Sequence, residues 1–149
     1  MDPKETILLA DDDENDVLLL KMAFAKAGLQ EQLKRVKDGA QAIQYLDGEG
    51  MYSDRTRFPL PGLLLLDLKM PYKNGFEVLD WIRAHPSFKC LIVAVLTASK
   101  DDVDVRRAYS LFTNSYLVKP ATLAGLEELA RKVKEYWLEL NLNLMVGTE

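Results

Sequence analysis

A chain of 149 residues in which 48% are apolar can bury the core of one domain and is too apolar to be disordered. Its net charge of −4, with no basic stripe, disfavours nucleic-acid binding. A single cysteine, Cys90, excludes an internal disulfide and fits a reducing cytoplasm. Because no run resembles a signal peptide or is long enough to span a bilayer, we expect a cytoplasmic globular protein that binds no membrane.

Short apolar runs alternate with helical patterns along the chain. The run at 7–10 precedes a helix at 17–27, and a weaker strand at 33–36 precedes a helix at 40–47. Apolar runs of this length are typical of strands buried on both faces of a parallel sheet. Further strands are expected at 63–66, 93–97 and 116–119, and further helices at 75–85, 102–111 and 123–140. Five such units with right-handed crossovers predict an α/β fold: a doubly wound five-stranded parallel sheet in a three-layer αβα sandwich.

Two segments are less regular. Residues 48–62 form a long loop, which is either functional or a plain insertion. The tail at 141–146 alternates polar and apolar residues, as the edge of a strand does, but none of the five units offers it an obvious partner.

Polar residues stand where four of the strands end. They are Asp11 and Asp12 after the first strand, Asp67 after the third, Thr97 in the fourth and Lys119 in the fifth. Ligands of open α/β sheets bind beyond the carboxyl ends of the strands, so these side chains should converge. Carboxylates suit Mg²⁺, and a carboxylate can also attack phosphorus as a nucleophile. Lys119 would supply a counter-charge and Thr97 a neutral donor, which predicts a site for a cation and a phosphoryl group.

Simpler interpretations exist for single residues. The acids at 11–13 alone could equally be a solvated turn and a helix cap. His85 has no other metal-ligand residue nearby in the sequence and is expected at the surface, whereas Cys90 is expected to be an inert packing residue. The acids, Thr97 and Lys119 together are much more specific than any one of them.

The chain resembles the receiver domains of two-component response regulators, which have the flavodoxin-like receiver fold. The matching residues are Asp11-Asp12, Asp67-Leu68-Lys69-Met70-Pro71 with Asn74-Gly75, Leu96-Thr97-Ala98 and Tyr116-Leu117-Val118-Lys119-Pro120. Within the family, the long loop at 48–62, Asn114-Ser115-Tyr116-Leu117 and Tyr136-Trp137-Leu138-Glu139 resemble the single-domain regulators paired with phytochrome histidine kinases. The resemblance implies one receiver domain over 1–149, with an extended last helix and a tail from about 136.

The resemblance also implies roles for single residues. Asp67 would be the phosphoacceptor. Asp12 would bind Mg²⁺ directly and Asp11 through water, and the backbone carbonyl of Lys69 would complete the protein ligands. Lys119 would pair with Asp67 and then with the phosphoryl group.

Further implied roles concern switching and phosphate lifetime. Thr97 and Tyr116 would form the switch pair that moves when phosphate arrives. The peptide bond before Pro120 would be cis. Lys69 and Ser99 occupy positions at which the family tunes the lifetime of the phosphate.

The chain departs from the family before its fifth strand. Many receivers have Gly-Ala there, where this chain has Phe112-Thr113. We expect a left-handed residue at Asn114, which tolerates that conformation well. Phe112 is then either a core residue or part of an interface.

Three function classes remain to be compared. In the first, the chain is a response regulator that is phosphorylated by a sensor histidine kinase, with a phytochrome among the candidates, and signals to a downstream protein or phosphotransfer protein. The second is a Mg²⁺-dependent aspartyl-phosphate phosphatase, but haloacid dehalogenase-type hydrolases carry a second acid where this chain has Lys69. The third is an adaptor that works without phosphorylation. No DNA-binding pattern follows the fifth unit, so an output through protein contacts, without enzymatic turnover, is expected.

The last helix and the tail also predict a homodimer. Leu126, Leu129, Val133, Trp137 and Leu140 follow helical spacing, and Leu138, Leu142, Leu144 and Val146 add apolar groups, with Phe112 as a further candidate.

Overall fold

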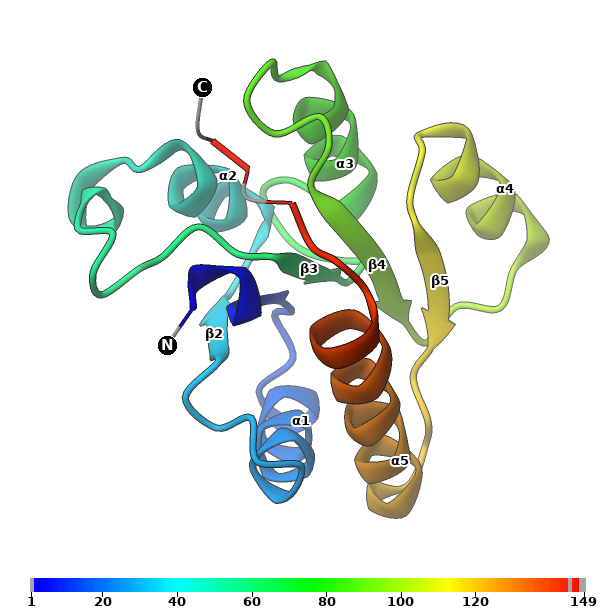
Figure 1. Cartoon of the computed structure of the whole chain (residues 1–149). Coiled ribbons are helices and arrows are strands. Elements are labelled where there is room, and N and C mark those ends of the chain that lie inside the picture. Colours follow the sequence, from blue (N-terminus) through cyan, green and yellow to red (C-terminus); the bar gives the residue numbers. More distant parts are fainter. Residues whose placement is uncertain (1, 145, 148–149) are drawn as a thin grey trace.

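The computed structural model describes residues 2–144 and 146–147 and contains one parallel sheet (Figure 1). Its strands follow the order β2-β1-β3-β4-β5, which is the doubly wound arrangement expected from the sequence. The strands are β1 (Ile7–Ala10), β2 (Leu33–Val36), β3 (Leu63–Leu66), β4 (Ile92–Thr97) and β5 (Ser115–Val118).

Helices cover both faces of the sheet. In Figure 1, α1 and α5 lie together on one side, α2 and α3 lie on the other, and α4 stands beside β5. The bounds are α1 (Glu14–Lys26), α2 (Gly39–Asp47), α3 (Gly75–Ala84), α4 (Asp102–Ser110) and α5 (Leu123–Val133), which continues as a π-helical segment (Lys134–Leu140). Short 3-10 helices occupy Pro3–Glu5 and Gly50–Ser53. None of the helices in the described ranges is long and apolar enough to cross a membrane.

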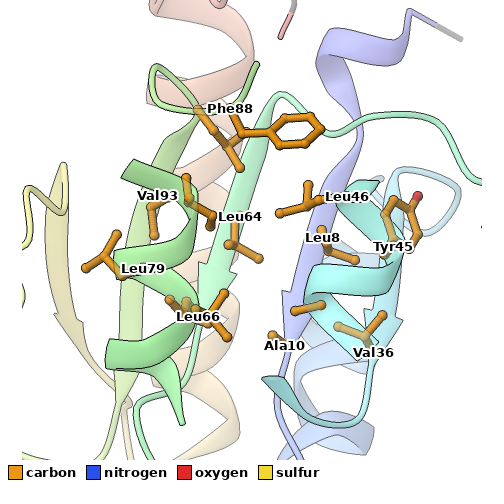
Figure 2. Packing of buried hydrophobic residues seen from close by; sticks show 14 of the residues in the cluster. Leu8, Ala10, Val36, Tyr45, Leu46, Leu64, Leu66, Leu79, Phe88 and Val93 are labelled. Atoms are coloured by element: carbon orange, nitrogen blue, oxygen red, sulfur yellow. The ribbon is translucent and has the colours of Figure 1, made fainter. Parts of the chain in front are cut away.

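The central strands are apolar throughout because each of their two faces meets a helical layer. Leu8 and Leu64 point towards α2 and α3 (Figure 2), whereas Leu9 and Leu65 pack with the α1 and α5 side chains. All residues of β1 and β3 are buried. This two-sided burial is the physical reason that these runs do not alternate with polar residues.

The first helix begins three residues earlier than the sequence pattern indicates. The Asp13 carboxylate accepts hydrogen bonds from the backbone N–H groups of Asn15 at 2.9 Å and Asp16 at 3.0 Å. This N-cap satisfies two of the free donors of the first turn, so the polar stretch after β1 is already helical.

The long loop between α2 and β3 is packed against the domain. The Tyr52 and Phe58 rings lie 5.1 and 6.0 Å from the ring of Tyr45 in α2. Arg55 donates to the backbone oxygens of Tyr45 and Leu46, both at 2.7 Å, and so satisfies carbonyls at the end of α2. The loop therefore closes the end of α2.

The tail folds back over its own domain (Figure 1). Val146 is buried in the cluster beneath α2 and α3, and the Gly147 N–H donates to the Ser87 backbone oxygen at 3.0 Å. The Asn143 side chain donates to the Lys4 backbone oxygen at 3.3 Å. The expectation that Val146 would belong to an exposed apolar patch is therefore wrong, because this side chain completes the core of its own chain.

The residues expected to drive self-association fall into two groups. Leu126 and Val133 are buried, and Leu129, Trp137 and Leu138 pack against the α1–α5 side of the core. The remaining apolar side chains, which are exposed, are Leu140, Leu142, Leu144 and Phe112.

The left-handed residue before β5 is Phe112, with φ +66°, so the expectation of Asn114 is wrong. Asn114 is committed elsewhere, since its side-chain oxygen accepts from the Val93 N–H at 2.8 Å. Arg83 donates to the Phe112 carbonyl at 2.9 Å and helps to hold the turn. The Phe112 side chain is 72% exposed, which excludes the core-packing interpretation.

Three further expectations need correction. The peptide bond before Pro120 is trans, the isomer that X–Pro bonds favour by about 0.5–1 kcal/mol. Cys90 is exposed instead of packed, because it lies in the loop before β4. His85 is half-buried, since its ring packs against the rings of Trp81 and Phe88.

Candidate functional site

The polar residues at the strand ends converge because the strands are parallel and in register. Ala10 pairs with Leu66, which places the following residues Asp11 and Asp67 side by side at the carboxyl edge of the sheet. Thr97 pairs with Val118, the residue before Lys119. The strand ends therefore gather the acids, the hydroxyl and the ammonium at one edge.

Lys119 lies between three carboxylates. Its Nζ is 2.7 Å from Asp11 Oδ2, 3.0 Å from Asp16 Oδ2 and 3.3 Å from Asp67 Oδ2. The Lys119 side chain is only 9% exposed, so its pairs with Asp11 and Asp67 are shielded from water, whereas the Asp16 side chain is 43% exposed. An ammonium group has three N–H donors, and three carboxylates stand within their reach.

Burial and charge act on these groups in opposite directions. Burial raises the pKa of Asp11 above its ordinary value, although its bonds to Lys119 and to the Asp13 N–H partly offset this. Burial alone would lower the pKa of Lys119, but its hydrogen bonds and the charges of Asp11, Asp67 and Asp16 together raise it. Lys119 therefore remains an ammonium at neutral pH.

Three of the acids can converge on a cation. One carboxylate oxygen from each of Asp11, Asp12 and Asp67 lies within 4.8 Å of the others. Oxygen ligands at this spacing fit a hard divalent cation. A cavity of about 480 Å³ opens beside them and is bordered by Lys69 and Thr97, which leaves room for a phosphoryl group.

Thr97 and Tyr116 are joined through Ser99. Thr97 is buried, and its hydroxyl oxygen is 3.5 Å from the Ser99 backbone nitrogen. The Tyr116 hydroxyl donates to the Ser99 backbone oxygen at 3.0 Å. The Tyr116 ring is half-buried beside the cluster that contains Leu68 and Phe76, and burial raises the pKa of this tyrosine. Thr97 and Tyr116, the switch pair expected from the sequence, therefore both contact Ser99 in the loop after β4.

Asp16 and Arg35 belong to the site but were missed in the sequence. Asp16 lies three residues after the Asp13 cap and reaches Lys119 from the first turn of α1. Arg35 donates to the Asp11 backbone oxygen at 3.0 Å and pairs with Glu14. The position of Asp16, three residues after the cap residue Asp13, could have indicated from the sequence that it lies near the site. The Arg35 contact could not have been predicted in this way, because it depends on the pairing of β2 with β1.

Comparison with known proteins agrees with this geometry. Residues 7–131 match the family model for the response regulator receiver domain. The chain belongs to this family. That assigns it to two-component signalling proteins.

Three relatives are similar over most of their length. The probable methanogenesis regulatory protein FilR2 of Methanothrix harundinacea is 38% identical, in an alignment that spans 91% of this chain and 84% of FilR2. Response regulator Rcp1 of Synechocystis is 35% identical over 92% of this chain and 91% of its own, and a Mn²⁺-bound structure of Rcp1 has a TM-score of 0.83. The phosphorylated cyanobacterial phytochrome response regulator RcpA is 34% identical, with a TM-score of 0.85 over 94% of this chain and 98% of its own.

Proposed function

We propose that this receiver accepts a phosphoryl group on Asp67 from the phosphohistidine of a sensor histidine kinase. The observation that carries the proposal is the position of the Asp67 carboxylate, 3.3 Å from the Lys119 ammonium and within the acidic cluster. Asp67 retains 8% exposure, so a donor can reach it from the cavity at the strand ends.

The chemistry requires a nucleophile and charge neutralisation. An Asp67 oxygen attacks phosphorus, the P–N bond of the donor histidine breaks, and the histidine nitrogen keeps the electron pair and takes a proton. Lys119 then donates to a phosphoryl oxygen and offsets its negative charge.

The acidic cluster is proposed to hold Mg²⁺. Asp12 would be a direct ligand and Asp11 a ligand through water, with Asp67 and the Lys69 backbone carbonyl completing the protein's contribution. When bound, the cation would neutralise charge between the carboxylates and the phosphoryl oxygens. The Mn²⁺-bound structure of Rcp1 supports a divalent cation in this family.

We propose that Thr97 and Tyr116 carry the signal. The Thr97 hydroxyl would turn towards the phosphoryl group, and Tyr116 would exchange its bond to Ser99 for the space that Thr97 leaves. This biases two existing conformations of the surface formed by α4, β5 and α5.

The likeness to the phytochrome regulator RcpA favours a phytochrome as the cognate kinase. The whole chain would act as one receiver unit in the cytoplasm and would signal to a downstream or phosphotransfer protein, without enzymatic turnover. Lys69, which is exposed beside Asp67, supports this against a phosphatase of the haloacid dehalogenase type, since such an enzyme needs a general acid at that position.

A homodimer is proposed through the exposed apolar residues at the end of the chain. Leu140 is 76% exposed and Leu142 is 92% exposed, and the exposed Tyr136 lies one helical turn before Leu140. Apolar groups gathered in this way are typical of contact surfaces. Light-scattering mass at micromolar concentration should give twice the chain mass, and Leu142→Asp should return it to one chain.

The phosphoacceptor is tested with a labelled phosphohistidine donor. The wild type should retain label in Mg²⁺, and a chelator should abolish the labelling. Asp67→Asn should take no label, whereas Asp80→Asn, which removes an exposed carboxylate from α3, should label like the wild type. Label retained by Asp67→Asn would contradict the proposal.

A further inference from the structure

Asp16 is the third carboxylate of Lys119 and lies outside the acidic cluster that can bind a cation. Its Oδ2 is 3.0 Å from Lys119 Nζ, and the contact joins α1 to the loop after β5. The cluster itself consists of Asp11, Asp12 and Asp67. Two partners of the Lys119 ammonium, Asp11 and Asp67, therefore also belong to the cluster that can bind a cation, whereas Asp16 does not.

The first turn of α1 leaves the Asp16 side chain free for this contact. An acid three residues after an N-cap can bond back to the N–H of the cap residue. Here the Asp13 N–H instead donates to Asp11 Oδ1 at 3.0 Å. The Asp16 N–H donates to the Asp13 carboxylate at 3.0 Å, which holds the residue in place while its own carboxylate points to Lys119.

The other two partners of Lys119 change during phosphorylation. Asp11 and Asp67 supply oxygens for a cation, and Asp67 also loses its negative charge when its oxygen is bonded to phosphorus. Lys119 must then turn one N–H towards the phosphoryl group and give up contacts with these acids. Asp16 neither belongs to the cation-binding cluster nor changes its charge when Asp67 is phosphorylated.

We propose that Asp16 is a positioning residue that anchors the Lys119 ammonium throughout the cycle. It keeps one N–H of Lys119 bonded, so that another points towards the incoming phosphoryl group. It also draws the ammonium away from the oxygens that a cation needs. The inference rests on the proposed function of Asp67.

The first test measures the rate at which Asp67 is labelled by a small acyl phosphate in Mg²⁺. Asp16→Ala should lower the maximal rate about tenfold, equal to about 1.4 kcal/mol, and should change the KM for the donor less than about twofold. Asp16→Asn should recover most of the rate, because its amide oxygen still accepts from Lys119. Asp101→Asn, which removes an exposed carboxylate on the rim of the same cavity, should react like the wild type.

The second test measures Mn²⁺ affinity by calorimetry in a double-mutant cycle. Asp16→Ala should weaken binding about threefold in the wild-type background, because the ammonium then competes for Asp11 and Asp67. In the Lys119→Ala background, Asp16→Ala should weaken binding no more than Asp101→Asn does. An equal loss in both backgrounds would show that Asp16 acts only through its charge and would overturn the proposal.

The outcomes separate this inference from the function on which it rests. If the wild type takes no label on Asp67, the proposed function fails. If the wild type is labelled and Asp16→Ala reacts at the same rate, only the role of Asp16 fails. An Asp16→Asn variant as slow as Asp16→Ala, with the melting temperature of the wild type, would also overturn the anchoring role.

Discussion

Replacing Lys119 with methionine removes the only cation in contact with a fully buried carboxylate among the residues that the structure describes. Asp11 is 0% exposed and lies 2.7 Å from the Lys119 ammonium. Methionine preserves most of the side-chain volume, so the change isolates the charge. The variant must either bury an uncompensated Asp11 carboxylate or protonate it.

The cost follows from the burial of both groups. Removing one partner of a buried ion pair costs about 3–5 kcal/mol. We expect the lower end of this range, about 3 kcal/mol, because the Asp16 side chain is 43% exposed and its ion pair with Lys119 adds little to the loss. For a chain of this length, that lowers the melting temperature by about 6–12 °C.

The stability lost in Lys119→Met should depend on pH. Burial already raises the pKa of Asp11, and loss of Lys119 raises it further. A carboxyl whose pKa is raised in the folded state binds more protons folded than unfolded, so the stability of Lys119→Met should fall as pH rises above the ordinary carboxyl range. Lowering the pH towards 5 should therefore recover part of the loss.

The assay is thermal unfolding between pH 5 and pH 8 in the presence of a chelator. Lys100→Met, which removes an exposed lysine on the rim of the same cavity, should melt like the wild type. Asp11→Asn combined with Lys119→Met should recover most of the stability, since the one fully buried carboxylate of the site is then neutral and Asp67 keeps 8% exposure. Lys119→Met melting with the wild type at every pH would refute the reasoning.

Further predictions concern the loop before β3, the turn before β5 and the tail. In urea unfolding, Arg55→Ala should lower the free energy of unfolding by about 2 kcal/mol, because two carbonyls at the end of α2 lose a charged donor. The control Arg57→Ala should change it by less than about 0.5 kcal/mol. Phe112→Gly should raise the melting temperature by about 2–4 °C in calorimetry, since an exposed side chain in a left-handed conformation costs about 1 kcal/mol; a lower value would contradict this explanation. Val146→Asp should release the tail and speed amide exchange at its end, while Leu144→Asp, a change at an exposed neighbour, should leave exchange unaltered.

The pattern of apolar and polar residues along the chain determined the central strands and the edge of the sheet at which the site residues meet. Strands buried on both faces must be apolar throughout, so Leu63–Leu66 identified a central strand without knowledge of its neighbours. In a parallel sheet, all strands end at the same edge, so Asp11, Asp67 and Lys119 could be placed together from their positions in the chain alone. The left-handed position near the start of β5 could be expected as well, although not the residue that adopts it.

The tertiary structure decided the contacts between residues far apart in the chain. Lys119 meets Asp16 because α1 packs against α5, and this depends on where two layers of side chains come to rest. Val146 is buried because the tail folds back onto the core cluster that contains Phe88, which no periodicity in the tail could reveal. Phe112 is left-handed because it ends α4, where its N–H donates to the Tyr109 carbonyl and the Thr113 N–H donates to the Ala108 carbonyl, while the Asn114 side chain is bonded across to β4. In each case, the choice depends on packing and hydrogen bonding across the assembled domain, whereas sequence patterns report only which face of an element is buried.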